Sequence, residues 1–206
     1  MMSPEAATAD HVYRLIRHEI VEGAFLPGHV LKLGQLTEAF GTSATPVRDA
    51  LNRLVGERLV DLLPGGGFRV RPLGPARLVS LYAWHGALAQ LALGTRWPKS
   101  VKEHLGALRR DVDKSGQFAS VAGAFFAILA AATRNEELEA ALTAASHVLA
   151  RARALEHLLI PGAVDELAQL IATIEANDSA AARHAMAGYH RARIRRSRQI
   201  HKMMQA

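Results

Sequence analysis

The sequence contains no cysteine, which excludes a disulfide framework and any zinc site built on cysteine ligands. Its first residues, MMSPEAATADHVYRL, lack the charged start and apolar run of a secretory signal. The 206 residues suit one medium domain or two small ones, and 50% of them are hydrophobic, so a sizeable core can form. We expect a cytoplasmic protein.

Acidic residues are missing from one end of the chain. Residues 183–206 contain seven Lys/Arg and no Asp or Glu, residues 74–182 contain ten and eleven, and residues 1–73 contain eight and eight. The formal net charge of +6 therefore comes from the C-terminal segment. A basic balance is not, by itself, evidence that the N-terminal half binds nucleic acid.

Two function classes lack their usual signals. We find no Ser/His/Asp arrangement, no phosphate-binding glycine loop that opens a helix after a strand, and no HExxH pair, so we expect no enzyme. Ser115–Thr133 carries no charge, but alanine supplies much of its bulk. A membrane span needs roughly 20 strongly apolar residues, so this segment is interpreted as a buried helix of a soluble bundle with no membrane partner.

Local signals predict three helices in the N-terminal third. Asp10 is a plausible N-cap for a first helix that ends near Gly23. A short helix over Leu33–Phe40 stops at Gly41. The next helix begins after Thr42-Ser43, with Pro46 in its first turn, where the missing N–H costs little.

A β-hairpin is predicted next, with strands over Leu59–Leu63 and Phe68–Arg71 joined by a glycine-rich loop. This order is that of a winged helix-turn-helix, which places one helix in the major groove of duplex DNA. Beyond the linker near Pro75, helical stretches break at five places and give about six helices, an antiparallel bundle. The breaks lie near Trp97-Pro98, Ser115-Gly116, Arg134-Asn135, Ile160-Pro161-Gly162 and Asn177-Asp178.

The expected fold is therefore mainly α, with a winged helix-turn-helix and small β-hairpin over residues 1–72 and an all-α bundle over residues 73–206. Within the first domain, Arg48 is the best candidate for base contacts, because a guanidinium pairs with guanine O6 and N7 together. Hydroxyls at the helix start and a glycine wing suit phosphate contacts. The candidate DNA-binding residues are Thr42, Ser43, Thr45, Arg48, Arg53, Gly65, Gly66 and Arg69. The alternatives are helix capping for the hydroxyls, a plain tight hairpin for the glycines, and a salt bridge to Asp49 for Arg48.

This segment resembles the GntR family of bacterial transcription regulators. The residues that carry the resemblance are Pro27-Gly28, Leu31, Leu36, Phe40-Gly41, Ser43, the run Thr45–Leu51, Leu54 and Gly67–Val70. The family usually reads Ser-Arg-Thr-Pro-Val-Arg, and Ala44 stands in place of the first arginine, which commonly touches DNA in the family. The resemblance thus implies weaker or differently specified binding per subunit, because a good bidentate base contact contributes roughly 1–3 kcal/mol of discrimination.

The helical half contains Asn135 and Leu138 after an apolar helix, and the stretch Ile174-Glu175-Ala176-Asn177-Asp178 followed by Ala181-Ala182-Arg183 and Met186. On these residues it is similar to the FadR-type C-terminal domain (FCD), which forms the dimer and holds an effector. Many FCD proteins bind a divalent metal through an aspartate and three histidines, ligands that suit zinc, nickel or manganese. Those positions fall here on Ala122, Phe126, Leu167 and Tyr189. We therefore expect no metal, no other cofactor, and filled core or an apolar pocket in that space.

Aromatic and histidine residues of the helical half are candidates for an effector pocket: Tyr82, His85, Phe126 and Tyr189. Core packing is the alternative for the aromatic residues. A different site could be built from His85, His147, His157, His184 and His190, with surface or hydrogen-bonded histidine as the alternative.

The C-terminal helix carries Arg191, Arg193, Arg195, Arg196, Arg198 and Lys202, whose spacing is interpreted as charge spread around the helix. A solvated helix, a phosphate contact and a salt-bridged contact with a partner subunit all fit this segment.

The favoured function is a sequence-specific transcription regulator, a repressor that acts as a homodimer on a near-palindromic site in double-stranded DNA and responds to a small-molecule effector. The alternatives are a regulator that senses no effector, and a dimerisation or scaffold protein with a weakened DNA reader.

Overall fold

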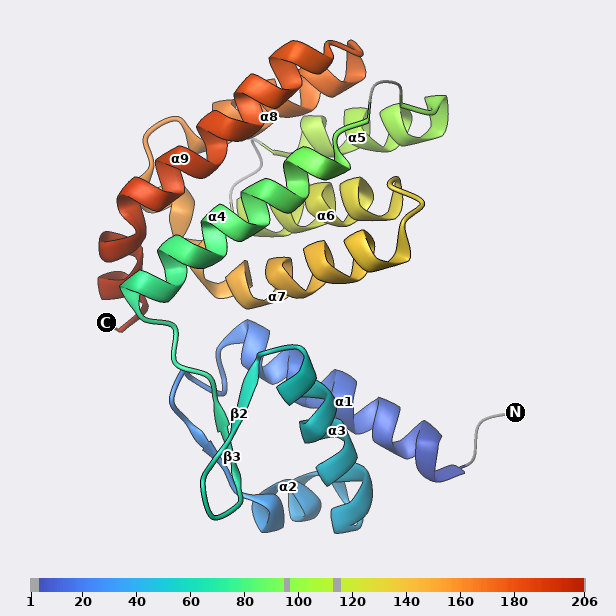
Figure 1. Cartoon of the computed structure of the whole chain (residues 1–206), viewed down its shortest axis with the longest axis vertical. Helices are drawn as coiled ribbons and strands as arrows, with labels where there is room; N and C mark the ends of the chain where they lie inside the picture. The colour runs from blue at the N-terminus through green and yellow to red at the C-terminus, as the bar shows by residue number, and fades with distance from the viewer. Residues whose placement is uncertain (1–3, 95–96, 113–115, 206) are drawn as a thin grey trace. The chain divides into compact units, whose positions relative to one another are not determined.

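The computed structural model describes residues 4–94, 97–112 and 116–205 (Figure 1). The chain divides into two compact units, Met1–Leu73 and Gly74–Ala206. The fold is mainly helical, with a helix-turn-helix and wing in the first unit and a helical bundle in the second, which confirms the predicted fold class.

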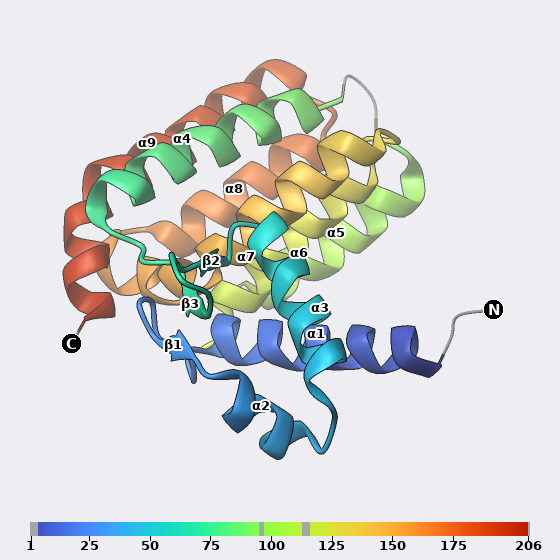
Figure 2. The same ribbon diagram turned by 60° about the horizontal axis from the view of Figure 1, so that its bottom comes forward.

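The N-terminal unit contains three helices, α1 (Pro4–Glu22), α2 (Leu33–Phe40) and α3 (Ala44–Gly56). The long helices α1 and α3 pack together (Figure 2) through buried apolar side chains, among them Ile16, Leu51 and Leu54. Helix α1 begins at Pro4, so the prediction that Asp10 caps this helix is wrong. Asp10 lies inside the helix, where its carboxylate binds Arg53 and Arg14.

The wing is a three-stranded antiparallel sheet in the order β1-β3-β2, not the two-stranded hairpin predicted from the sequence. Its strands are β1 (Val30–Leu31), β2 (Val60–Leu62) and β3 (Phe68–Val70). Phe68 pairs with Leu31 on one side and with Leu62 on the other. Strand β1 has two residues, too few for a period-two pattern to reveal it.

The helical unit contains α4 (Pro75–Ala92), α5 (Lys99–Asp111), α6 (Phe118–Ala131), α7 (Glu136–Leu159), α8 (Ala163–Glu175) and α9 (Ser179–Met204). The described helix breaks lie at the predicted places, and Ser115 of the second break lies outside the described residues. Asn135 and Asp178 cap α7 and α9 by accepting backbone N–H bonds from Leu138 and Ala181.

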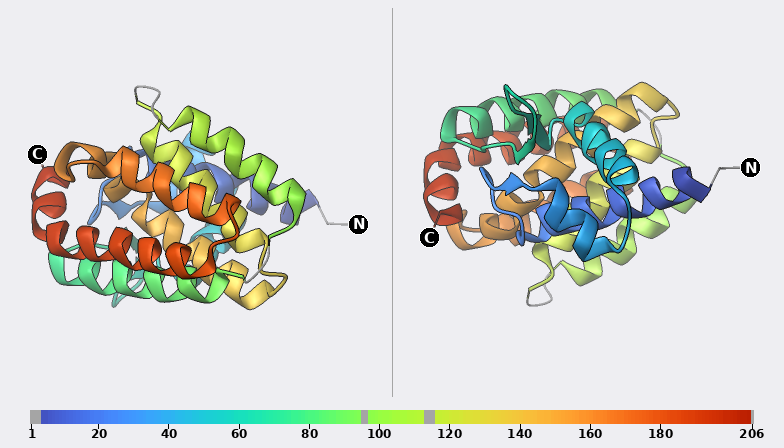
Figure 3. Two further views of the ribbon diagram at one scale, coloured as in Figure 1. Left: turned by 90° about the horizontal axis from the view of Figure 1, so that it is seen from above. Right: turned by 90° about the horizontal axis from the view of Figure 1, so that it is seen from below.

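Helices α4 and α9 run side by side and antiparallel along one face of the helical unit (Figures 1 and 3). Gly86 permits this close approach, because a Cβ atom there would lie 2.9 Å from the His190 ring. Gln90 and Arg183 bond to each other's backbone carbonyls and fix the register. The two helices therefore bring residues 82–90 and 183–193 side by side.

The uncharged helix α6 is a core helix, with Phe118, Ala122, Phe125 and Phe126 all buried. Within the described ranges, no single helix is long and apolar enough to cross a membrane. One bent pair, α7 with α8 at 113°, passes a test of length and composition.

Candidate DNA-reading surface and buried polar core

The turn between α2 and α3 places three hydroxyl-bearing residues, Thr42, Ser43 and Thr45, at the start of α3. Gly41 ends α2 with a left-handed φ of 59°, and Ser43 occupies the N-cap of α3 in an extended conformation. The Ser43 side chain makes no capping hydrogen bond, so capping does not occupy its hydroxyl. Ser43 and Thr45 are exposed and Thr42 is half-buried.

Arg48 lies on the exposed face of α3, opposite the buried Val47, Leu51 and Leu54. In the part of the chain that the structure describes, its guanidinium forms no ion pair, with Asp49 or with any other carboxylate. A guanidinium that is exposed and unpaired keeps all five of its N–H donors available for a ligand.

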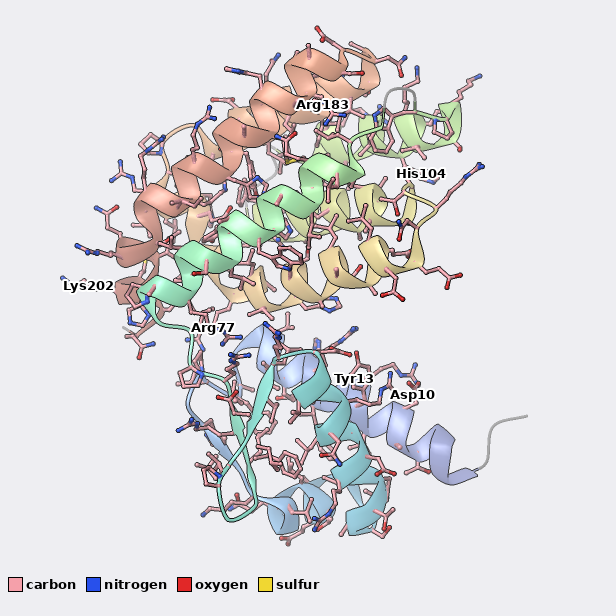
Figure 4. The ribbon with its side chains drawn as sticks, in the orientation of Figure 1. Asp10, Tyr13, Arg77, His104, Arg183 and Lys202 are labelled. Carbon is pink, nitrogen blue, oxygen red and sulfur yellow. The ribbon has the colours of Figure 1, made fainter. Side chains whose placement is uncertain are left out.

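Arg53 is engaged within the N-terminal unit. Its Nη1 lies 3.0 Å from Asp10 Oδ1, and its guanidinium stacks 3.9 Å from the centre of the Tyr13 ring. The Tyr13 hydroxyl in turn donates to Glu57 at 2.6 Å. These contacts tie α1 to α3 (Figure 4 labels Asp10 and Tyr13), so Arg53 has a structural role that the sequence did not reveal.

The wing has an unobstructed glycine backbone at its tip and two arginines that are paired with Asp61. Gly65, Gly66 and Gly67 all have φ near +90°, and a Cβ atom at any of them would meet nothing within 4 Å. A partner can therefore approach this backbone closely. Arg69 lies opposite Asp61 in the sheet, 3.7 Å from its carboxylate, and Arg71 lies 3.4 Å from the same group.

This arrangement has a known counterpart: the family model described as bacterial regulatory proteins, gntR family, matches residues 8–70. Residues 8–70 therefore form a domain of the GntR type. The HTH-type transcriptional repressor GlaR of Escherichia coli K12 is 31% identical over 102 residues, 45% of this chain and 46% of GlaR. An uncharacterised HTH-type regulator of Agrobacterium vitis is 32% identical over 114 residues, 53% of this chain and 66% of that protein. The chain thus spans about half to two thirds of the length of these relatives.

Solved structures extend the likeness in fold to both units. The structure of E. coli McbR/YncC covers 97% of this chain and 99% of its own, with a TM-score of 0.72 and 23% identity. A putative GntR regulator from Rhodococcus sp. RHA1 covers 94% and 97%, with a TM-score of 0.76 and 16% identity. At these identities the likeness shows the fold alone.

In the helical unit, the four residues predicted for an effector pocket are all buried in one cluster. Phe126 meets the rings of His85 at 4.3 Å and Tyr189 at 5.6 Å between centroids. Tyr82 joins them through Glu156, which accepts hydrogen bonds from Tyr82 Oη at 2.8 Å and Tyr189 Oη at 3.2 Å. The structure thus brings the four side chains together, around a carboxylate that the sequence did not single out.

Glu156 also binds the largest fully buried side chain, Arg193. Arg193 Nε lies 2.8 Å from Glu156 Oε2, Nη1 donates to Glu166, and the guanidinium stacks 3.3 Å from the Tyr189 ring. Burial alone lowers the pKa of Arg193, and Tyr189 and the two carboxylates outweigh it, so the net shift in pKa is upward. Burial and Glu156 together raise the pKa of Tyr82. The expected filled core is confirmed at the four positions of the FCD metal pattern, because Ala122, Phe126, Leu167 and Tyr189 all belong to the buried hydrophobic cluster. The polar and charged groups lie beside this space.

His85 and His190 form a hydrogen-bonded relay. The Met186 carbonyl at one end of the relay decides which ring nitrogens carry protons. His190 Nδ1 lies 2.9 Å from the Met186 carbonyl, which only accepts, so this nitrogen donates. His190 Nε2 then accepts from His85 Nδ1 at 2.8 Å, and His85 Nε2 accepts from the Ser146 hydroxyl at 2.8 Å. All four ring nitrogens are occupied in neutral rings, which leaves no lone pair free for a metal.

Within residues 4–94, 97–112 and 116–205, no group of three or more His, Cys, Asp or Glu is arranged to hold a metal ion. The positions where the FCD pattern carries ligands hold Ala122, Phe126, Leu167 and Tyr189, all buried. A surface hollow of about 470 Å³ lies elsewhere, between the C-terminal ends of α7 and α9. None of the four predicted pocket residues lines it.

The relay predicts an acid-sensitive fold. Burial lowers the pKa of His190 from 6.5 to about 4, and burial with the neighbouring His190 lowers that of His85. The unfolded chain therefore binds more protons than the folded chain between these pH values, so the free energy of unfolding falls as pH drops from 6.5 towards 4. Urea unfolding at several pH values gives the slope of the free energy of unfolding against pH. In His190→Gln this slope should be smaller by the equivalent of about one bound proton. His184→Gln, at an exposed position of the same helix, is the control and should keep the wild-type slope; an unchanged slope in His190→Gln would contradict the assignment.

Proposed function

We propose that this chain is a cytoplasmic transcription repressor that binds double-stranded DNA as a homodimer and responds to a small molecule held in its helical unit. Residues 1–72 would form the DNA-binding domain and residues 73–206 the FCD-like domain for dimerisation and effector binding. The single observation that supports DNA binding best is the GntR-family reader with an exposed, unpaired Arg48 on the helix after the turn. The similarity to the HTH-type transcriptional repressor GlaR supports the sign of regulation.

DNA recognition is proposed to proceed with α3 in the major groove, Arg48 on base edges and the hydroxyls of Ser43 and Thr45 on phosphates. The glycine tip of the wing lets backbone N–H groups approach the sugar-phosphate backbone. Arg53 and Arg69 contribute less than the sequence predicts, because Asp10 and Asp61 hold their guanidinium groups.

Removal of the Arg48 guanidinium should weaken operator preference. In Arg48→Ala we expect affinity for the operator to fall about 10-fold to 100-fold, since a good bidentate base contact contributes roughly 1–3 kcal/mol. Fluorescence anisotropy with an operator duplex measures this effect. Arg14→Ala on α1 removes a cation of the same unit and serves as the control; equal losses in the two variants would contradict base contact by Arg48.

A homodimer is proposed to form through the outer face of α4. No residue from Leu78 to Ala92 is charged, yet Val79, Trp84 and Leu91 are 39%, 53% and 72% exposed. Apolar surface of this kind marks interaction sites. Trp84 and Leu91 lie seven residues apart with the exposed Ala87 between them, so a second copy crossing antiparallel at Ala87 would place each Trp84 against Leu91 of the partner subunit.

A charge on this face should therefore prevent dimer formation. Trp84→Glu and Leu91→Glu are each expected to be monomeric by light scattering at concentrations where the wild-type protein is dimeric. Leu158→Glu, at a position 57% exposed on α7, is the matched control and should remain dimeric. A dimer that survives both α4 substitutions would place the interface elsewhere.

Effector sensing is supported by a second buried arginine. Arg153 is 3% exposed, yet no described carboxylate forms an ion pair with it, and its one hydrogen bond runs 3.5 Å to the Ser146 carbonyl. Its guanidinium lies 5.3 Å from the centre of the Phe126 ring. Buried charges are normally paired, so an anionic small molecule would supply the missing counter-charge. This differs from the metal-held effectors of many FCD proteins.

Anions should consequently stabilise the protein through Arg153. We expect the melting temperature to rise with saturation on titration with carboxylates or inorganic phosphate at constant ionic strength, relative to chloride. Arg153→Met should lose this rise, and Arg110→Met, at an exposed position of α5, should keep it. A rise that persists in Arg153→Met would exclude this arginine as the anion site.

The whole proposal is tested by selecting bound DNA from a random pool, with and without a metabolite extract. An enriched near-palindromic site would support a dimeric reader, and its loss with extract would support sensing. A dimer that enriches no sequence would favour the scaffold interpretation, which the replacement of an arginine by Ala44 supports.

A further inference from the structure

Helix α9 has a buried inner face and an exposed outer face. Its inner face is buried along the length of the helix, at Met186, Tyr189, His190, Arg193, Ser197, Ile200 and Met204. Its outer face carries Arg191, Arg195, Arg198 and Lys202, all exposed. We call these four residues the α9 stripe; Figure 4 labels Lys202 near the C-terminal end of the helix. The sequence-based interpretation of charge spread around the helix holds for Arg193 and Arg196, which lie on other sides of α9, whereas the remaining four residues share one face.

The spacing of the α9 stripe is four, three and four residues, which keeps the four side chains within one narrow sector of the helix. At 1.5 Å per residue the stripe extends about 16 Å. Arg193 lies between these residues in sequence but points into the core, where Glu156 and Glu166 neutralise it.

The stripe has no counter-charge. Residues 183–206 contain no Asp or Glu, and among the described residues no carboxylate forms an ion pair with Arg191, Arg195, Arg198 or Lys202. Like charges three and four residues apart destabilise a helix, so this arrangement costs stability in the free protein. A polyanion along the outer face would remove that repulsion.

We infer that the α9 stripe binds the phosphate backbone of duplex DNA and adds affinity that does not depend on sequence. This inference rests on the proposed function as a DNA-binding regulator. Duplex DNA carries one charge per about 1.7 Å of its axis, so a 16 Å line of cations can meet several phosphates at once. The N-terminal unit, with eight charges of each sign, lacks this contribution, and Ala44 removes one more cation from it.

A membrane surface fits the stripe less well. Helices that lie on membranes insert an apolar face below their basic residues. The apolar face of α9 is buried in the bundle, and Met203, at 39%, is the one large hydrophobic side chain of the described part of α9 that is substantially exposed. DNA phosphates attract basic side chains and need no apolar face to insert, so they fit the α9 stripe better.

The test is the salt dependence of binding to a 40-base-pair duplex of random sequence, measured by anisotropy between 50 and 200 mM salt with the full chain. The variant changes Arg191, Arg195, Arg198 and Lys202 to Gln. Each cation that releases a counterion contributes about 0.9 to the slope of log affinity against log salt, so four contribute up to about 3.6. We expect the variant to lose most of this slope and at least about tenfold in affinity at 50 mM salt.

The matched control changes four cations outside α9, Lys99, Lys102, Arg110 and Arg134, to Gln and should leave the slope unchanged. Circular dichroism should show wild-type helix content in both variants. An unchanged slope in the stripe variant overturns the inference, and so does an equal loss in both variants, because net charge alone would then explain it. Loss of binding to phosphatidylserine vesicles with unchanged DNA binding also overturns it.

The outcome is separable from that of the proposed function. Arg48→Ala should weaken operator preference and keep the slope that the stripe contributes. If the random-pool selection enriches no site while the stripe variant still loses its salt slope, the stripe binds DNA and the sequence-specific reader fails.

Discussion

The packing of the helical unit depends on the hydrogen bonds and the ion pair that the carboxylate of Glu156 forms. It lies 1% exposed on α7 and receives hydrogen bonds from Tyr82 on α4 and from Tyr189 and Arg193 on α9. Arg193 extends the link to Glu166 on α8. Breaking a buried pair by removing one partner costs about 3–5 kcal/mol, because the remaining charge is left uncompensated. The position of α9, and with it the direction of its outer face, therefore follows from one glutamate.

Much of the fold could be predicted because its signals are local. Gly41 ends α2 through its own left-handed conformation, and Asn135 and Asp178 cap the helices that follow them. The missed features are pairings between distant residues. Asp10 looks like an N-cap until Arg53, 43 residues away, is seen to bind it. Strand β1 exists because β3 provides a partner for its two residues.

The residues proposed to bind DNA or an effector, and those that support them, divide in the same way. Arg48, Ser43 and Thr45 could be named from the sequence because the turn before α3 decides which side chains precede and open that helix. Glu156, Arg153 and Arg193 could not, since each resembles a surface residue in its own segment. Arg193 stands in a run of arginines at alternating positions, and its burial follows from Glu156, 37 residues earlier in the chain. The apolar replacements at the FCD metal positions also gave no sign that charged groups would fill the space beside them.

The net charge of +6 can be interpreted only when the buried and the exposed cations of α9 are considered separately. Arg193 is balanced by buried carboxylates, whereas the α9 stripe has no acid in the last 24 residues to balance it. The reader, in contrast, is neutral and depends on a single unpaired guanidinium on α3. Base contacts carry specificity and phosphate contacts carry affinity, so the two proposed contacts would assign these tasks to different helices. A neutral reader would gain discrimination from this division, because little of its own binding energy would be independent of sequence.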